Sequence, residues 1–152
     1  MENDLGLMSD DLIKEEFIKR FTLEAGQRLP SASSAADHLR TLFTESKYRE
    51  SFAMIYLNSQ HAVIESKILF TGSLDTAAVY PRELIRSIMV DYPATNAVII
   101  AHNHPSGCNT PSQSDQKITR KLKTALEAID IALLDHIIIG KEYYSFADHH
   151  QL

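Results

Sequence analysis

Hydrophobic residues recur at helical spacing near the start of the chain. They would form one apolar stripe on a helix, made of Leu12, Ile13, Phe17, Ile18 and Phe21. Gly, Pro and hydroxylated residues interrupt the pattern over residues 26–34. A second helix is expected next, capped by Ser33 or Ser34 and carrying Leu39, Leu42 and Phe43. We therefore expect an N-terminal helix and linker over residues 1–35 and the main domain over residues 36–152.

The hydrophobic period changes to that of strands from Phe52 onward. Two adjacent strands separated by a turn are predicted first, followed by two continuous apolar strands and a short last one: 52–57 and 62–70, then 97–101, 131–139 and 143–146. Continuous apolar strands are typical of a sheet covered on both faces.

Two further helices are predicted between these strands. Pro81 opens the first, at a position where its missing N–H costs nothing, and this helix ends near Pro93. The second runs from Ser112 to Ile129 with apolar residues along one side. Helices interleaved with buried strands predict an α/β fold, a single layered domain with a mixed β-sheet flanked by helices.

Composition is that of an ordinary globular protein, with 44% hydrophobic and 23% charged residues in a chain of 152. A single cysteine, Cys108, excludes an internal disulfide framework and an all-cysteine zinc finger. No segment reaches the roughly 18 apolar residues that span a bilayer, and the acidic N-terminus is unlike a signal peptide. We expect a cytoplasmic protein with no membrane partner.

Two histidines follow the apolar strand over residues 97–101. His102 and His104 are two positions apart, so they point to the same side of an extended segment, and Pro105 disfavours the α region for His104. Two imidazoles that project together beyond a strand end can hold a metal ion. Two solvent-facing loop histidines would show the same spacing.

Ser112 and Asp115 extend this pair into a candidate site. Taken alone, they fit a plain helix N-terminus, with a serine cap and an acid in the first turn. Joined to the histidines, Asp115 would complete a zinc site of two His and one Asp, which keeps a fourth position for water.

The spacing His102-x-His104-x7-Ser112-x2-Asp115 resembles the metal motif of the JAMM (MPN+) metallohydrolases. A longer string resembles their bacterial RadC-like branch over roughly residues 36–148: Phe70-Thr71-Gly72-Ser73, Pro81-Arg82-Glu83, His102-Asn103-His104-Pro105-Ser106-Gly107 and Leu134-Asp135-His136. This resemblance implies an MPN/JAB-like fold, similar in layout to cytidine deaminases, and Zn²⁺ bound by His102, His104 and Asp115. Full-length RadC proteins also carry a helix-hairpin-helix region, which residues 1–35 are too short and too poor in glycine to supply.

The resemblance also implies two catalytic side chains. A glutamate at the start of the first core strand is the family's general base, and Glu50 occupies that place, whereas spacing alone leaves Glu65 and Glu83 open. Glu50 would take a proton from water and pass it to the leaving amine, and Ser112 would hydrogen-bond the developing oxyanion. We therefore expect a zinc-dependent hydrolase of a peptide or isopeptide bond, with a peptide or protein substrate.

Other functions stay open at this point. A nucleic-acid-associated repair accessory or nuclease is the alternative, based on the RadC resemblance and on a basic helix with Lys117, Arg120, Lys121 and Lys123. The net charge of −5 argues against general nucleic-acid binding. A zinc nucleobase deaminase would need H-x-E and P-C-x-x-C, which the chain lacks. Asp135-His136 is either a core pair or a support for a metal ligand.

Overall fold

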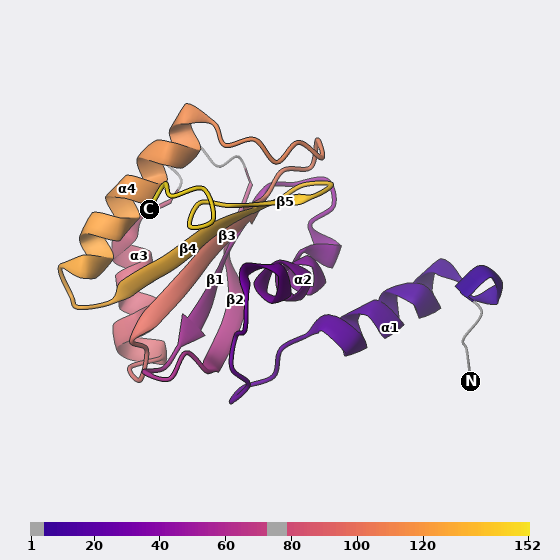
Figure 1. Cartoon of the computed structure of the whole chain (residues 1–152), viewed down its shortest axis with the longest axis horizontal. Helices are drawn as coiled ribbons and strands as arrows, with labels where there is room; N and C mark the ends of the chain where they lie inside the picture. The colour runs from indigo at the N-terminus through magenta and orange to yellow at the C-terminus, as the bar shows by residue number, and fades with distance from the viewer. Residues whose placement is uncertain (1–4, 73–78) are drawn as a thin grey trace.

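A mixed β-sheet forms the centre of the molecule in a computed structural model that describes residues 5–72 and 79–152. Within these residues the sheet has five strands in the order β2-β1-β3-β4-β5 (Figure 1). The strands are β1 (Ser51–Leu57), β2 (Val63–Thr71), β3 (Ala97–Asn103), β4 (Ala132–Ile139) and β5 (Tyr143–Ser145). β3 and β4 run parallel and the other neighbouring pairs run antiparallel. The predicted α/β domain with a mixed sheet is confirmed.

Helices cover both faces of the sheet. α2 lies on one face, whereas α3 and α4 lie on the other (Figure 1). The helices are α1 (Asp10–Phe21), α2 (Ala32–Leu42), α3 (Pro81–Arg86), which continues as a π-helical turn over Ser87–Asp91, and α4 (Gln113–Glu127), with 3₁₀ turns at Leu5–Leu7 and Phe43–Glu45. Within the described ranges, no helix is long and apolar enough to cross a membrane.

Alternation along β1 divides the core into two halves. Ala53 and Ile55 face the cluster on the α2 side, and Met54 and Tyr56 face the cluster under α3 and α4. All seven residues of β1 and all seven of β3 are buried. This burial on both faces explains why these strands are continuous apolar runs in the sequence.

The cap of α2 differs from the prediction. Ser31, rather than Ser33 or Ser34, caps the helix, because its hydroxyl accepts a hydrogen bond from the backbone N–H of Ser34 at 3.1 Å. An N-cap hydroxyl accepts from a backbone N–H two or three residues further on. Because α2 begins at Ala32, Ser31 is the residue directly before it, whereas Ser33 and Ser34 already lie inside its first turn. The prediction of Ser33 or Ser34 as the cap is therefore wrong.

α1 lies outside the layers around the sheet and contacts α2 (Figure 1). It begins after Ser9, which caps it, and none of its residues is buried. Leu12 is 50% exposed and Phe21 is 40% exposed. The apolar stripe predicted from the sequence is therefore present, but the rest of the described chain covers only part of it.

Candidate metal centre

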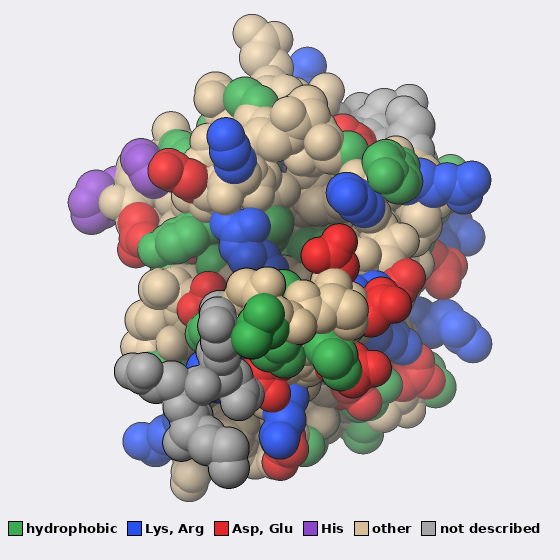
Figure 2. Space-filling view, turned by 90° about the vertical axis from the view of Figure 1, so that its right-hand side faces the viewer, with side chains coloured by type: hydrophobic (Ala, Val, Ile, Leu, Met, Phe, Trp, Pro, Cys, Tyr) green, Lys and Arg blue, Asp and Glu red, His purple; other side chains and the backbone are tan. Residues whose placement is uncertain are grey.

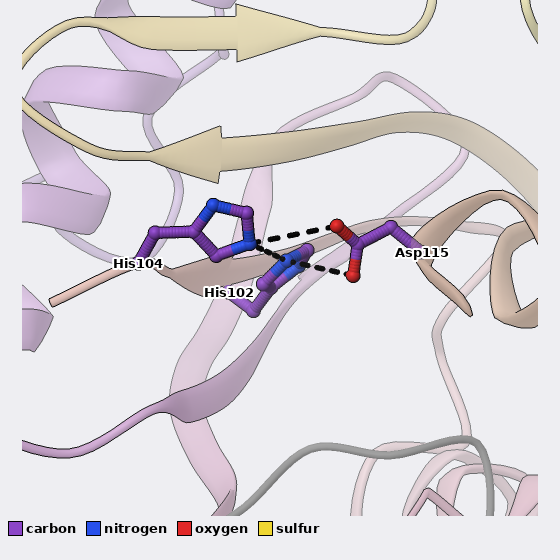
Figure 3. Close-up of side chains that lie close together, drawn as sticks. All are labelled: His102, His104 and Asp115. Carbon is purple, nitrogen blue, oxygen red and sulfur yellow. Dashed lines mark hydrogen bonds and ion pairs between the residues drawn. The ribbon is translucent and has the colours of Figure 1, made fainter. Parts of the chain in front are cut away.

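Three side chains converge at the end of β3, namely His102, His104 and Asp115 (Figure 3). β3 runs to Asn103, two residues beyond the predicted end, because His102 and Asn103 continue the pairing with β4. His102 therefore belongs to the strand and His104 follows it directly, while Asp115 lies in the first turn of α4. One ligand atom from each lies within 4.8 Å of the others, so the group could hold a metal ion.

The three side chains make close polar contacts. Nε2 of His102 is 2.9 Å from Nε2 of His104 and 3.2 Å from Oδ1 of Asp115, and Nε2 of His104 is 3.5 Å from Oδ2 of Asp115. Burial would raise the pKa of Asp115, but hydrogen bonds from His102 and His104 outweigh it and hold that pKa well below its usual range. The carboxylate is therefore ionised.

A backbone carbonyl fixes the orientation of the His104 ring. Nδ1 of His104 lies 2.7 Å from the carbonyl oxygen of Cys108. A carbonyl oxygen only accepts, so Nδ1 carries the hydrogen and Nε2 points toward Asp115. Cys108 thus takes part through its backbone, and its thiol is exposed.

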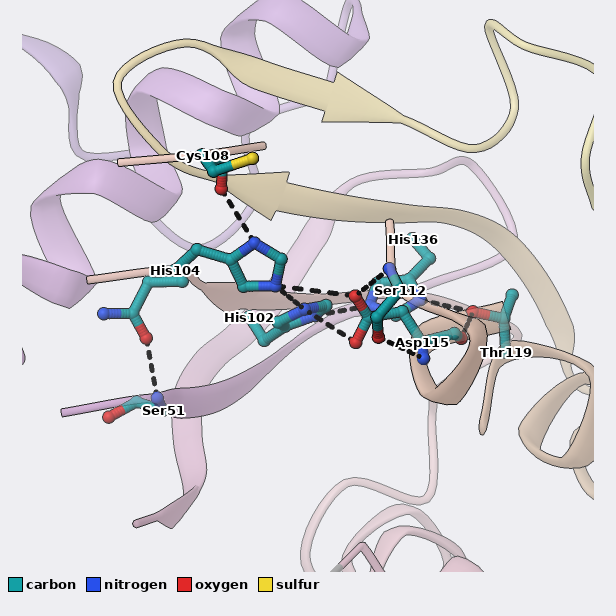
Figure 4. Close-up of polar contacts among 9 residues, drawn as sticks. Ser51, His102, His104, Cys108, Ser112, Asp115, Thr119 and His136 are labelled. Atoms are coloured by element: carbon teal, nitrogen blue, oxygen red, sulfur yellow. Dashed lines mark hydrogen bonds and ion pairs between the residues drawn. The ribbon is translucent and has the colours of Figure 1, made fainter. Parts of the chain in front are cut away.

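A relay of hydrogen bonds fixes the His102 ring from the other side (Figure 4). The hydroxyl of Thr119 donates its single hydrogen to the carbonyl oxygen of Asp115 at 2.6 Å, so it accepts from Nδ1 of His136, also at 2.6 Å. Burial lowers the pKa of His136 well below its ordinary value, so this ring is neutral. Its Nε2 therefore accepts from Nδ1 of His102 at 2.8 Å.

This donor set fits a divalent metal ion. Both outer Nδ1 atoms carry hydrogens, so each Nε2 can donate to Asp115 only in a protonated ring. In the neutral rings the two Nε2 lone pairs face each other and the Asp115 carboxylate. Such an arrangement is repulsive unless a cation lies within it. Accordingly, Asp115 raises the pKa of His104 against the opposing effect of burial, which favours a proton there. Two imidazole nitrogens and one carboxylate oxygen also form a ligand set of open zinc sites.

Asp115 has a structural role as well as its place in this cluster. The hydroxyl of Ser112 accepts from the N–H of Asp115 at 3.0 Å, and Oδ2 of Asp115 accepts from the N–H of Ser112 at 2.8 Å. This capping box begins α4. The two interpretations of Ser112 and Asp115 are therefore compatible, because the cap holds the carboxylate where it meets the histidines.

Glu50 lies directly before β1, on the side of the sheet end where the histidines stand. It lines a cavity of about 480 Å³ that Pro105 also lines. Asp115 and the Cys108 carbonyl raise the pKa of His104 most, and the charge of Glu50 makes a smaller contribution in the same direction. Glu65 pairs with Tyr56 near the opposite end of β1, and Glu83 is exposed in the first turn of α3. This placement favours Glu50 over those two alternatives.

Asn103 connects the histidine pair to the segment that carries Glu50. Its Oδ1 accepts from the N–H of Ser51 at 2.6 Å, and its Nδ2 donates to the carbonyls of Ser46 and Arg49 at 2.9 and 3.0 Å. Sequence reasoning did not identify Asn103 as a site residue. Its position between two ligands within a buried strand is the signal that could have found it.

The Asp135-His136 pair divides into two roles. His136 belongs to the relay described above, whereas Asp135 accepts from the hydroxyl of Ser145 at 2.6 Å and from the N–H of Ala147 at 3.0 Å. Burial raises the pKa of Asp135, with these hydrogen bonds opposing it. Asp135 thus anchors the C-terminal segment. The motif residue Ser73 lies outside the described residues.

Removing the acceptor behind His102 is expected to weaken metal binding. His136→Phe keeps a ring that can stack on Phe146, now 4.8 Å away between centroids, but it leaves Nδ1 of His102 without its acceptor. Loss of such an orienting partner typically costs 10- to 100-fold in metal affinity, and we expect a loss of about that size. Competition with a chromophoric chelator measures the affinity. Thr119→Ser should retain it and Thr119→Val should not, and equal affinities in all variants would contradict the relay.

Comparison with known proteins assigns the chain to a family. A family model described as RadC-like JAB domain matches residues 29–152. A UPF0758 protein of Shewanella sp. (strain W3-18-1) is 46% identical over 127 residues, which cover 83% of this chain and 55% of the relative. A UPF0758 protein of Aliivibrio fischeri (strain MJ11) is 41% identical over 137 residues, covering 88% and 60%. The chain thus spans little more than half the length of these relatives, and it belongs to the family of RadC-like JAB domain proteins.

Proposed function

We propose that this domain is a zinc-dependent hydrolase that cleaves a peptide or isopeptide bond. One observation carries the proposal: Nε2 of His102, Nε2 of His104 and the carboxylate of Asp115 face one another, and each is held from outside by a further hydrogen bond. Membership in a JAB domain family supports metal-dependent hydrolysis.

Zinc held by His102, His104 and Asp115 would act as a Lewis acid and lower the pKa of water from roughly 15.7 to about 7. Glu50 would accept the proton of the attacking water on its carboxylate and donate it to the leaving amine. The position of Glu50 suits this role. Its side chain is half-buried and lines the same cavity as Pro105, which directly follows His104 in the sequence.

Ser112 would stabilise the developing oxyanion. Its oxygen accepts the N–H of Asp115, which directs the hydroxyl hydrogen elsewhere and leaves it able to donate. The side chain lies at the exposed rim of the site, where a substrate carbonyl can reach it. Donors of this kind contribute about 2.7–4 kcal/mol to the transition state.

A nucleic-acid-associated role is the alternative. It depends on four basic residues of α4. The Nζ of one of them, Lys123, lies 3.7 Å from Oε1 of Glu127, an ion pair that is typical of a solvated helix face. A zinc deaminase is a weaker candidate still, because that class binds zinc through cysteines, whereas the candidate ligands here are two histidines and an aspartate. We therefore propose peptide-bond or isopeptide-bond hydrolysis as the function.

Metal removal and restoration test the proposed function. The protein is purified, assayed for metal, and incubated with a peptide library and with isopeptide-linked peptides, whose products are identified by mass spectrometry. We expect cleavage that stops when zinc is chelated and returns when zinc is added back. Stoichiometric zinc in a protein that leaves every amide substrate intact while it cuts oligonucleotides would favour the alternative.

A further inference from the structure

A cleft opens beside His104, on the α2 side of the sheet. Its volume is about 430 Å³, which is within the range of ligand-binding sites. Figure 2 looks onto this face and shows a hollow with Lys and Arg side chains at its edge, Asp or Glu side chains beside them, and hydrophobic side chains deeper inside. Because His104 lines the cleft, whatever occupies it lies next to the candidate metal centre.

The charged residues that line this cleft are all basic. They are Arg40, Lys47 and Lys141, and none of the described residues lining it is acidic. The chain as a whole has the opposite charge balance, with 15 Lys and Arg residues and 20 Asp and Glu residues. Glu45, on the neighbouring 3₁₀ turn, is paired with Lys14. The cleft therefore presents positive charge that the residues lining it do not balance.

Hydrogen bonds hold the Arg40 guanidinium in place within the cleft. It donates to the carbonyl oxygens of Gly140 and Lys141 at 3.0 and 3.2 Å. Two of its five donors serve these bonds, so others can bind a carboxylate. A cation that is already oriented loses little freedom when a ligand binds, which favours recognition.

The wall behind Arg40 is closely packed. The N–H of Lys141 donates to the carbonyl of Gly107 at 2.7 Å, and a Cβ at Gly140 would lie 2.5 Å from that same oxygen. The β4–β5 turn and the loop after His104 thus form one unit. The basic cleft and the candidate metal centre keep a fixed relation for this reason.

We propose that this cleft binds an acidic segment of the substrate, beside the peptide bond to be cleaved. The inference rests on the proposed function and names its substrate class. A second cavity, which contains Arg49 and Glu50, shares Pro105 with the cleft. A chain that crosses from one cavity to the other passes the candidate centre, with carboxylates on the side of Arg40, Lys47 and Lys141.

An acidic peptide fits this cleft better than a nucleic acid does. Of its two aromatic lining residues, Phe43 is only 6% exposed and Phe17 is partly exposed, so the cleft lacks the series of open rings on which successive bases stack. The basic residues of α4 belong to the opposite face of the sheet from α2, so they do not extend the cleft into a continuous basic track. The positive charge is thus confined to a short site.

Binding of matched labelled peptides tests the proposal. Fluorescence anisotropy compares a glutamate-rich peptide, a twin with Gln in place of each Glu, and a single-stranded oligonucleotide, with zinc-loaded protein. We expect the acidic peptide to bind about tenfold more tightly than its twin. Lys47→Gln with Lys141→Gln, both at exposed positions, should remove this preference. Lys117→Gln with Lys121→Gln on α4 changes the net charge equally and should retain it.

Several results would overturn the proposal. They are equal binding of the two peptides, equal losses in the cleft and α4 variants, or an oligonucleotide that binds more tightly than the acidic peptide and depends on the cleft lysines. Cleavage with no preference for acidic peptides would contradict the role proposed for the cleft but would still support the hydrolase function. Selective binding of acidic peptides that are never cleaved would support the role of the cleft and contradict the hydrolase function.

Discussion

Protein with His102→Ala is expected to be purified without its metal. The substitution removes one of three side chains whose ligand atoms lie within 4.8 Å of one another. Loss of an orienting partner alone costs 10- to 100-fold in affinity, so we expect loss of a ligand to cost more than about 100-fold. Metal analysis of the purified protein measures the result. His149→Ala changes an exposed histidine and should keep the metal, whereas stoichiometric zinc in His102→Ala would refute the site.

Asp115 allows the ligand role to be separated from the helix cap. Asp115→Ala removes both, but Asp115→Asn keeps a side-chain oxygen that can accept the N–H of Ser112. Asp115→Asn should therefore lose metal with a nearly unchanged melting temperature. Ser112→Ala should lose about 0.5–2 kcal/mol of folding stability and keep the metal.

Glu50→Gln is expected to keep the metal and lose turnover. Glutamine has the shape of glutamate but cannot accept the proton, and removal of a general base typically costs 10²- to 10⁴-fold in rate. We expect kcat to fall by roughly that factor while zinc content is unchanged. Glu65→Gln and Glu83→Gln serve as matched controls and should keep activity. Retained activity in Glu50→Gln, with loss in one of the controls, would assign the base elsewhere.

Local patterns predicted the fold well because its core strands are buried on both faces. The apolar runs around Ile55 and Ile99 and the proline that opens α3 needed no tertiary information. The end of β3 was misjudged, since its last two residues are held by pairing with a strand more than thirty residues away. The Ser31 cap was missed because several serines compete there, and only the backbone geometry separates them.

The candidate site, like the fold, could be predicted from the sequence only in part. His102 and His104 share a side because of strand alternation, which a sequence displays directly. The contacts that orient them do not appear in any local pattern. His136 reaches His102 across 34 residues, and Asn103 reaches Ser51 across 52. The roles of Glu50 and Ser112 stay predictions, for which the structure supplies a position.

Asn103 makes the two halves of the site depend on one register. Its side chain holds the segment of Glu50, and the residues on either side of it are the two histidines. A slip of β3 by one residue against β1 would turn both imidazoles to the opposite face and release that segment in the same event. Ligands and base would then be lost together rather than one by one. Partial unfolding at this end of β3 should therefore produce an inert domain instead of one that binds metal without a base.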